Sequence, residues 1–523
     1  MKIQKYSSDK LSNHYDAIII GSGISGLCTA ALLSMNNKKV LVLEKHFKVG
    51  GYTHTFKRQN FEWDVGIHYI GGVHLKKTFT RRLFDKITNN NLKWNKMSDN
   101  YDRIIFPDKS YDFTAPKEKF IENMINYFPS EKDAIYKYMK IVEDANKTMF
   151  KYFSAKALSG ISEFFLYNYL SKQYFKYSDK TTYDALSEIT SNKELIGVLT
   201  GQWGDYGLPP KQSSFSMHCA IAGHYLDGAN YPIGGSRMIA ENIIPVIEEN
   251  GGDIFISTGV DRVNVVNGKT KGVILENGDL IDCDTVISSA GIQNTVTKFL
   301  KDNKDTDYQQ KLSTLEPSFG HACLYVGFNQ TAEDLNIKDT NLWIYPSYDH
   351  DLNTNIFMND ESADFPVVYI SFPSSKDPDW QKNYPGTATL EAIVPTNYGM
   401  YNKWAEKPWK NRGEDYEVYK ENLSQRIIKQ IYKHNPHLEN KISFYELSSP
   451  LSTRDMANYQ FGELYGMHHT PKRFRQKWLK AKTPIKGLFL TGQDITTVGL
   501  PSALASGVLT SSTVLKKNLF KSI

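Results

Sequence analysis

The sequence predicts an α/β fold in which a Rossmann-type domain, assembled from discontinuous segments of the chain, accompanies an α+β domain. Three observations lead to this prediction. The chain has 523 residues, more than the roughly 250–300 that a single hydrophobic core usually serves. Near the start, an apolar run, a glycine-rich turn and a stretch suited to a helix follow one another. The same order returns near the end, from residue 487 onward.

Composition argues against several classes of function. The net charge is +5, and the basic residues are spread along the chain, so no nucleic acid is expected as a partner. The four cysteines lie far apart without a Cys-x-x-Cys pair, which predicts reduced thiols and no zinc site. Residues 1–13 are polar, and no run of about 18 apolar residues follows. We therefore expect a cytoplasmic protein without a membrane-spanning segment.

The first predicted strand–turn–helix unit lies in residues 15–44. Tyr15–Ile20 is an apolar run, Leu27–Met35 is a run of small and apolar residues, and Val40–Leu43 is a second apolar run. Between the first two runs stands Gly-Ser-Gly-Ile-Ser-Gly, at positions 21–26. Short apolar runs bounded by turn residues are typical of buried strands. The unit is therefore predicted to be strand, turn, helix and strand.

The glycines of this turn have the spacing Gly-x-Gly-x-x-Gly. Gly21 permits a tight turn, Gly23 lets the backbone approach a pyrophosphate, and Gly26 lets the helix pack closely on the strand. Ser22 and Ser25 stand between them as further candidate contacts. Unpaired N–H groups at the start of the helix favour phosphate. The turn is thus predicted to bind a dinucleotide.

The stretch that follows the second strand distinguishes between dinucleotides. Glu44 ends that strand where a carboxylate can accept both ribose hydroxyls, and its charge would repel a 2′-phosphate, which leaves FAD or NAD. The adjacent Gly50 and Gly51 permit close approach to phosphate and ribityl groups, a need that an NAD site lacks. FAD is therefore the predicted cofactor. The candidate contacts of this stretch are Lys45, Gly50, Gly51, His54 and Thr55.

The middle of the chain has a different pattern. Residues 78–206 are rich in Lys, Asn, Tyr and Phe at helical spacing, which predicts a mainly helical region. Within it, residues 151–177 combine many aromatic rings with lysines, as helices at a membrane surface do. In the alternative interpretation the rings form the core of the region and the lysines extend outward to water. The sequence leaves both interpretations open.

Strand signals dominate the second half of the chain. Residues 251–290 contain short β-type runs separated by Asn-Gly pairs at 267–268 and 277–278, the pattern of successive hairpins. Residues 319–395 predict further strands, and residues 413–434 predict a helix.

The last predicted unit begins with the strand Gly487–Leu490. A helix begins near Pro501, since proline suits the first helical turn. Its positive end would stabilise a reduced, anionic flavin by about 0.3–2 kcal/mol, and the Asp494 carboxylate would accept hydrogen bonds from ribityl hydroxyls. The alternative is an ordinary strand-to-helix loop. The candidate contacts are Gly492, Asp494, Ser502 and Ala503.

Six segments span almost the whole chain in the order found in a known family: residues 21–26, 44–55, 61–69, 231–236, 372–377 and 491–500. Together they resemble the retinol saturase branch of the carotenoid isomerase and phytoene desaturase family of FAD-dependent oxidoreductases. The resemblance implies an FAD-binding domain in three parts and substrate-binding regions between them. The implied parts are 14–76, 216–298 and 483–516 for FAD, 77–215 for a mainly helical substrate- or membrane-facing region, and 299–482 for a substrate domain of sheet and helices.

The resemblance also implies roles for single residues. Val260 would contact adenine through its backbone. Residues 64–69 would pass near the isoalloxazine ring, where Gly66 permits close approach. His68 would supply or relay a proton, and Tyr69 is a second catalytic candidate. The alternative for both side chains is hydrogen-bonded packing.

The predicted reaction is addition of a hydride from N5 of reduced flavin to one end of a conjugated C=C bond, while a proton reaches the other end. The substrate would be an apolar polyene or isoprenoid lipid. A cis/trans isomerase and a desaturase have the same motifs, and an amine oxidase or a flavin-bearing lipid carrier also remains open. A second Gly-x-Gly-x-x-Gly is missing, so the external electron donor stays unidentified. The histidine spacings suit no metal, and none is expected.

Overall fold

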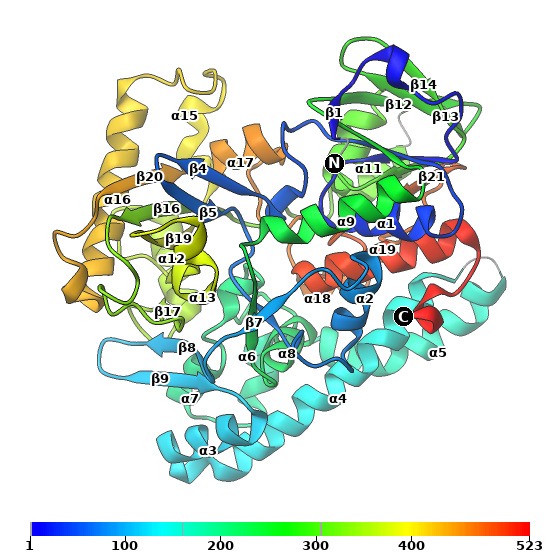
Figure 1. The fold of residues 1–523 in the computed structure, drawn as a ribbon. Helices are drawn as coiled ribbons and strands as arrows, with labels where there is room; N and C mark the ends of the chain where they lie inside the picture. The colour runs from blue at the N-terminus through cyan, green and yellow to red at the C-terminus, as the bar shows by residue number, and fades with distance from the viewer. Residues whose placement is uncertain (1–2, 159–160, 304–305) are drawn as a thin grey trace.

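A six-stranded parallel sheet is built from segments that lie far apart in the sequence. The computed structural model describes residues 3–158, 161–303 and 306–523. The strand order is β1, β11, β3, β2, β15 and β21, and all neighbouring strands are parallel. Figure 1 shows the blue, green and red segments of this domain side by side, so the predicted assembly from discontinuous segments is confirmed. The strands are β1 (Gln4–Lys5), β2 (Ala17–Ile20), β3 (Val40–Leu43), β11 (Asp253–Ile256), β15 (Val286–Ser288) and β21 (Leu488–Leu490).

Three helices cover one face of this sheet. They are α1 (Ile24–Ser34), α9 (Arg237–Glu249) and α19 (Leu500–Leu515). Alternate strand residues point to opposite faces, so Ile19 packs in the helical layer whereas Ile18 packs in the layer on the other side. Helix α2 (Phe79–Ile87) completes the helical layer.

A small antiparallel sheet covers the opposite face and contains the two predicted hairpins. It consists of β12 (Val260–Val266), β13 (Lys269–Leu275) and β14 (Leu280–Asp282). The turn between β12 and β13 is Asn267-Gly268, with φ angles of 50° and 71°, as a two-residue hairpin turn requires. Strands β11 and β15 lie at the two ends of residues 251–290, where the sequence predicted hairpins. They join the parallel sheet instead, because both are short and buried; β11 pairs with β3 and β15 pairs with β2.

A seven-stranded mixed sheet forms the centre of the second domain. Its strand order is β20, β16, β19, β18, β17, β8 and β9. Helices α12 (His350–Asn359) and α16 (Glu414–His434) cover one face, and α16 lies where residues 413–434 predicted a helix. The other face packs on the helical region of the chain and lines the cavity described below. The strands are β8 (Asn100–Ile105), β9 (Ser110–Thr114), β16 (Gly320–Phe328), β17 (Asn341–Ile344), β18 (Val368–Ser371), β19 (Ala388–Thr396) and β20 (Phe444–Ser448).

Strands β8 and β9 depart from the helical prediction for residues 78–206. Strand β8 pairs in parallel with β17, so Asp102 lies opposite Asn341. This pairing joins residues more than two hundred positions apart. Strand β8 is too short for its own alternation of side chains to predict this pairing.

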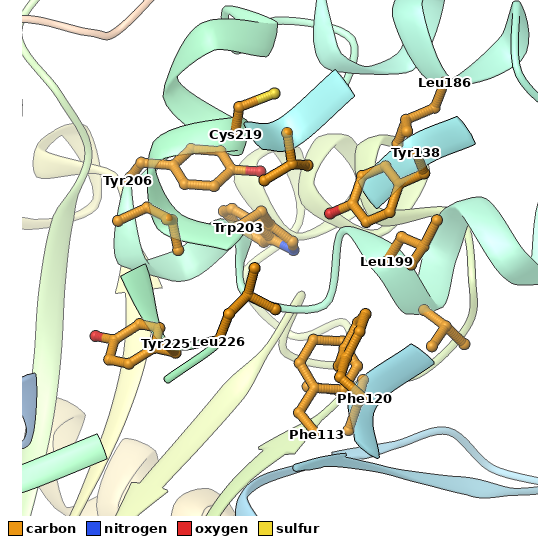
Figure 2. Close-up of a cluster of buried hydrophobic side chains, with 14 of the residues drawn as sticks. Phe113, Phe120, Tyr138, Leu186, Leu199, Trp203, Tyr206, Cys219, Tyr225 and Leu226 are labelled. Atoms are coloured by element: carbon orange, nitrogen blue, oxygen red, sulfur yellow. The ribbon is translucent and has the colours of Figure 1, made fainter. Parts of the chain in front are cut away.

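Helices do fill most of the same region. They are α3 (Lys117–Tyr127), α4 (Lys132–Lys156), α5 (Ile161–Ser178), α6 (Thr182–Ser187) and α7 (Lys193–Leu199), and α8 (Phe215–His224) follows after the region ends. Their shared core is aromatic, and Figure 2 shows Trp203 within it, with Tyr138, Tyr206 and Tyr225 around it. Across the described part of the chain, no helix has the length and apolar character needed to cross a membrane.

Short elements connect the two domains. They include β4 (Thr55–Arg58), β5 (Phe61–Asp64), β6 (Ile70–Gly71), β7 (Trp94–Lys96), β10 (Ala229–Pro232) and α13 (Pro373–Lys376). Strand β5 leads from the glycine-rich region toward the seven-stranded sheet, where the Trp63 indole N–H donates to the Val326 carbonyl at 3.0 Å. Residues 65–69 follow β5, and this path places them between the domains.

Candidate active site

One large cavity is lined by residues of both domains. Its volume is about 1310 Å³, larger than the roughly 300–1,000 Å³ of ordinary small-molecule pockets. At one end lie the residues that follow the parallel strands, among them Gly21 after β2, Glu44 after β3, Ser289 after β15 and Thr491 after β21. Ligands of open α/β sheets bind outside these carboxyl ends. The space suits an extended cofactor together with a second ligand.

The glycines at this end leave room that a side chain would fill. Gly21 and Gly492 have φ angles of +96° and +113°, a region that L-residues rarely adopt. A Cβ on Gly51 would lie 3.0 Å from the Cα of Gly23, and one on Gly26 would lie 2.3 Å from the Gly21 carbonyl oxygen. Backbone N–H groups can therefore approach a diphosphate closely, so the residues fit FAD.

Two helices begin at this end of the cavity. Helix α1 begins at Ile24, after its N-cap Gly23, and α19 begins at Leu500, after its N-cap Gly499. Pro501 occupies the first turn of α19, as predicted. Both helix N-termini carry unpaired N–H groups and a partial positive charge. The cavity therefore offers two sites for negative charge, which suits a diphosphate and an anionic ring.

Glu44 is held in place by the glycine-rich turn. Its Oε2 accepts hydrogen bonds from the Ser22 backbone N–H at 2.8 Å and from the Ser22 hydroxyl at 2.6 Å. Its Oε1 accepts from the His46 N–H at 2.7 Å. A carboxylate has about four lone-pair positions, so a position remains for a ribose hydroxyl. Ser22 thus orients Glu44 rather than lining the cavity.

Most of the predicted cofactor contacts line the cavity. Of the described residues, Ser22, Gly26 and Thr55 lie behind its wall: Gly26 packs against the strand, and the Thr55 hydroxyl donates to Glu62. The Asp494 carboxylate accepts from the N–H groups of Ile292 at 2.7 Å and Met467 at 3.2 Å. The predicted contacts that line the cavity are Gly21, Gly23, Ser25, Glu44, Lys45, Gly50, Gly51, His54, Gly66, Val260, Gly492, Asp494, Ser502 and Ala503, together with the catalytic candidates His68 and Tyr69.

The opposite end of the cavity is aromatic and apolar. Tyr69 stacks on Tyr225 with ring centroids 4.4 Å apart, and Trp343 packs on Tyr369 at 4.4 Å. These rings come from the loop after β5, from the segment after α8 and from the inward face of the seven-stranded sheet. Flat, rigid rings on several sides suit a long conjugated or branched apolar ligand. Further apolar lining is supplied by Met149, Met217, Ile221, Val367 and Ile393.

His68 lies where the two ends meet. Its Nδ1 is 2.6 Å from Oε2 of Glu391, a residue of β19 whose side chain is fully buried. Burial lowers the pKa of His68 to about 4 and raises the pKa of Glu391 to about 8. Both groups are therefore uncharged near pH 7, and one proton is shared between them.

Tyr69 belongs to a second buried network. Its hydroxyl oxygen lies within hydrogen-bonding distance of two carboxyl groups, 3.0 Å from Oδ2 of Asp102 and 3.2 Å from Oδ2 of Asp205. Burial, together with the neighbouring Asp102, raises the pKa of Asp205 to about 8. Burial also raises the pKa of Asp102. A phenol flanked by two carboxyl groups has a fixed orientation, and its own pKa is raised well above the usual value.

Lys376 connects the two networks. Its ammonium group donates to the His68 carbonyl at 3.0 Å, to Ser371 at 2.7 Å and to Asn341 at 2.5 Å. Burial lowers its pKa to about 8, while Glu391 and Asp102 oppose this shift. Lys376 is thus a fixed cation between buried carboxyl groups.

Four of these residues were not among the predicted site residues: Glu391, Lys376, Asp102 and Asp205. One signal was available for Glu391, which is the single charge in the otherwise apolar or neutral strand Ala388–Thr396. Lys376 lies in the segment 372–377, where the resemblance gave no role. The two aspartates carried no signal, since charged residues are frequent in their surroundings.

The geometry defines a flavin-dependent oxidoreductase, and the comparisons agree. A family model described as flavin containing amine oxidoreductase matches residues 24–515. The chain therefore belongs to this family, and FAD is its cofactor.

The predicted resemblance to the retinol saturase branch is also confirmed. The chain is 33% identical to all-trans-retinol 13,14-reductase from Danio rerio over 537 residues, which cover 99% of this chain and 88% of that protein. It is 25% identical to the chloroplastic prolycopene isomerase of Daucus carota over 470 residues, covering 85% and 70%.

Solved structures share the fold at low sequence identity. An oxidoreductase from Methanosarcina mazei is 15% identical, with a TM-score of 0.63 over 96% of this chain and all of that one. Putrescine oxidase bound to putrescine is 13% identical, with a TM-score of 0.61 over 96% and 99%. The two-domain fold of this chain is thus shared with these structures.

Proposed function

We propose that this oxidoreductase saturates a C=C bond of a polyene or isoprenoid lipid. The observation that carries the proposal is the single cavity, in which a glycine-lined end joins an aromatic and apolar end. A lipid chain lying among Tyr225, Trp343 and Tyr369 would reach the cofactor without passing through water. The similarity to a retinol 13,14-reductase over nearly the whole chain supports the same substrate class.

Each end of the cavity has a distinct task in this proposal. Bound FAD supplies hydride transfer, which amino-acid side chains cannot perform. The backbone around Gly21 and Gly23 holds the diphosphate, and Glu44 holds the ribose. His68, between the two ends, gives a proton to the lipid, and Tyr69 fixes the lipid by packing. The aromatic walls exclude water and so protect a reactive intermediate state of the lipid.

A redox-neutral polyene isomerase is the second candidate. The similarity to a prolycopene isomerase supports it, and the same cavity would serve. In an isomerase no hydrogen is gained by the lipid, so the mass of the product distinguishes the two.

We also propose that the surface of α5 touches a membrane. The aromatic stretch 151–177 divides into two groups: Tyr152, Tyr167 and Tyr174 are buried, whereas Phe164 and Tyr169 are 80% and 77% exposed. Such exposure of aromatic rings is typical of interfacial helices. The exposed side chains of the stretch include Phe164, Phe165, Leu166, Tyr169, Lys151, Lys172 and Lys176.

The position of this surface suits lipid entry. Helix α4 packs against α5 along one edge of the molecule (Figure 1). Asn146 and Met149 of α4 line the cavity, and the next residue, Phe150, is 59% exposed.

The four buried, unpaired cysteines support a reducing compartment such as the cytoplasm.

An anaerobic single-turnover experiment tests the reaction. Pre-reduced holoenzyme is mixed with one equivalent of an all-trans polyene alcohol, and the lipid is extracted and weighed by mass spectrometry. Saturation predicts a gain of two hydrogens per lipid and one oxidised flavin per turnover. An unchanged mass with altered double-bond geometry would favour the isomerase, and unchanged lipid would favour a carrier without turnover.

A further inference from the structure

A glutamate occupies the middle of a buried sheet. Glu391 lies on β19, opposite Tyr325 of β16 on one side and Ser371 of β18 on the other, and its side chain has no exposed surface. Glutamate is rarely buried in this way unless it is paired, because a charge loses its hydration there. An apolar residue would fill this position in the sheet at no such cost, so packing alone does not account for Glu391.

The side-chain hydrogen bonds of Glu391 lead to the last residue of β5 and to the loop that follows it. Its Oε2 lies 2.6 Å from His68 Nδ1, and its Oε1 accepts the backbone N–H of Asp64 at 2.7 Å. Of the two partners in the His68–Glu391 pair, His68 lines the cavity and Glu391 lies behind it. Because Nδ1 is occupied by Glu391, Nε2 is the nitrogen of His68 that is left for a ligand. Glu391 can therefore act on a substrate only through His68.

Buried titratable groups surround the pair. Burial raises the pKa of Glu391 to about 8, an effect that Lys376 opposes, and burial raises the pKa of Asp64 to about 7, with Glu391 adding to the shift. Near neutral pH, the proton of the pair therefore resides on the Glu391 carboxyl and is directed at Nδ1. The titratable groups packed around Glu391 are Asp64 of β5, His68 of the following loop, Asp102 of β8, Tyr231 of β10, His321, Cys323 and Tyr325 of β16, and Lys376 of α13.

We propose that Glu391 is a positioning residue that stores the proton passed on by His68. The inference rests on the proposed function. As the Nε2–H bond of His68 breaks, a C–H bond forms on the lipid; at the same time the O–H bond of Glu391 breaks and an N–H bond forms at Nδ1. The imidazole stays neutral throughout. The negative charge remains on Glu391, where the Lys376 ammonium stabilises it. The two electrons arrive with the hydride from reduced flavin, and water returns one proton to the pair after the product leaves.

Replacing Glu391 by glutamine removes the proton that we propose it stores and keeps nearly the same side-chain shape. Glu391→Gln keeps the acceptor for the Asp64 N–H and a donor for His68, but it has no acidic proton. The flavin content and the polyene affinity should stay at wild-type values, while the single-turnover saturation rate should fall about 10²-fold or more. The wild-type rate should be constant below pH 8 and fall above it, and this alkaline limb should disappear in the variant. Glu463→Gln, which removes another buried carboxyl, is the matched control and should keep both the rate and the limb.

Infrared spectroscopy of the oxidised holoenzyme without substrate tests the storage itself. The C=O band of the protonated Glu391 carboxyl should vanish as the pH rises through about 8 in the wild type and in Glu463→Gln. Glu391→Gln should lack that component. Asp205, whose pKa is also raised to about 8, contributes a second component, which Glu391→Gln should keep. If Glu391→Gln does not accumulate as folded protein, His68→Gln is measured instead. It changes the group that accepts the Glu391 hydrogen bond, and this change should shift the C=O band of Glu391.

Two results would overturn the proposal: an unchanged carboxyl band in Glu391→Gln, or a variant that keeps the alkaline limb of the wild type. The proposed function can fail separately. In that case the wild type leaves the polyene unsaturated, while the infrared band still reports whether Glu391 carries a proton.

Discussion

In the proposed function, the two ends of the cavity bind their ligands by different means. The end that holds the cofactor consists of backbone: glycines without Cβ atoms, two helix N-termini and the carboxyl ends of parallel strands. The end that faces the lipid consists of side chains, with stacked rings and buried acids that meet at His68. The first end recognises charge and shape close to the main chain, whereas the second determines which reaction follows. Substitutions in the two ends should therefore fail in different ways.

The largest effect is expected at Gly26. In Gly26→Ala, the added Cβ would lie 2.3 Å from the Gly21 carbonyl oxygen, which forces the phosphate-binding turn away from the helix. The purified protein should contain less than about a tenth of the wild-type flavin, by absorbance per mole of chain.

Gly386→Ala is the control for this loss. Its φ angle is +71° and no atom lies within 4 Å of the new Cβ, so it should cost about 1–2 kcal/mol of stability and no flavin. Full flavin in Gly26→Ala would contradict the close-packed turn.

The next effect should appear at the meeting point of the two ends. His68→Gln removes the proton donor but leaves the glycine-lined end intact. The single-turnover saturation rate should fall about 10²–10⁴-fold, the usual contribution of general acid catalysis. Flavin absorbance and polyene affinity should remain unchanged. A matching loss of flavin would show that the two ends are not separable.

The difference between the ends also explains how far the sequence could predict the molecule. Strand β3 and helices α16 and α19 were predicted closely, since β3 is a short apolar run between charged residues and the two helices begin beside glycine or proline. The glycines proposed to hold FAD could be selected from the sequence because a dinucleotide fixes their spacing. Strand β8 was not predicted, because it depends on pairing with β17 far along the chain, and β9 joins the sheet only through its hairpin with β8. Glu391, Asp102 and Asp205 were missed because only long-range folding brings them to His68 and Tyr69.

A smaller effect is expected outside the cavity, on α5. Replacing Phe164, Phe165 and Tyr169 by serine removes exposed rings, each able to contribute about 1 kcal/mol or more when buried in lipid. Affinity for vesicles that contain anionic lipid should fall about tenfold or more in a sedimentation assay, with full flavin content retained. The control is Phe47→Ser, at another exposed ring, which should bind vesicles as the wild type does. If the triple variant also binds vesicles as tightly as the wild type, α5 is excluded as the membrane contact.

The smallest effect concerns the pH dependence of stability. Glu391 has a folded-state pKa of about 8 against an ordinary value of 4.5, so the folded protein retains a proton that the unfolded chain loses. Its stabilising contribution is complete below the ordinary value and is lost as the pH rises to about 8, with a slope of up to about 1.4 kcal/mol per pH unit. Buried histidines with lowered pKa values act in the opposite direction, but below about pH 6.5.

Thermal unfolding of the holoenzyme between about pH 6.5 and 8 therefore reports mainly on the buried acids, although buried Lys156, whose pKa is lowered to about 7, acts in the opposite direction. The midpoint temperature should fall as the pH rises, and Glu391→Gln should flatten that slope. A parallel decline in wild type and variant would mean that Glu391 is ionised in the folded protein.

The central claim is that flavin and lipid occupy one continuous cavity, and an absorbance titration tests it most directly. Adding a non-reactive polyene analogue to oxidised holoenzyme should shift the flavin absorption bands and saturate at one ligand per chain. If the analogue binds at that stoichiometry yet leaves the flavin spectrum unchanged, the lipid lies elsewhere and the account is contradicted.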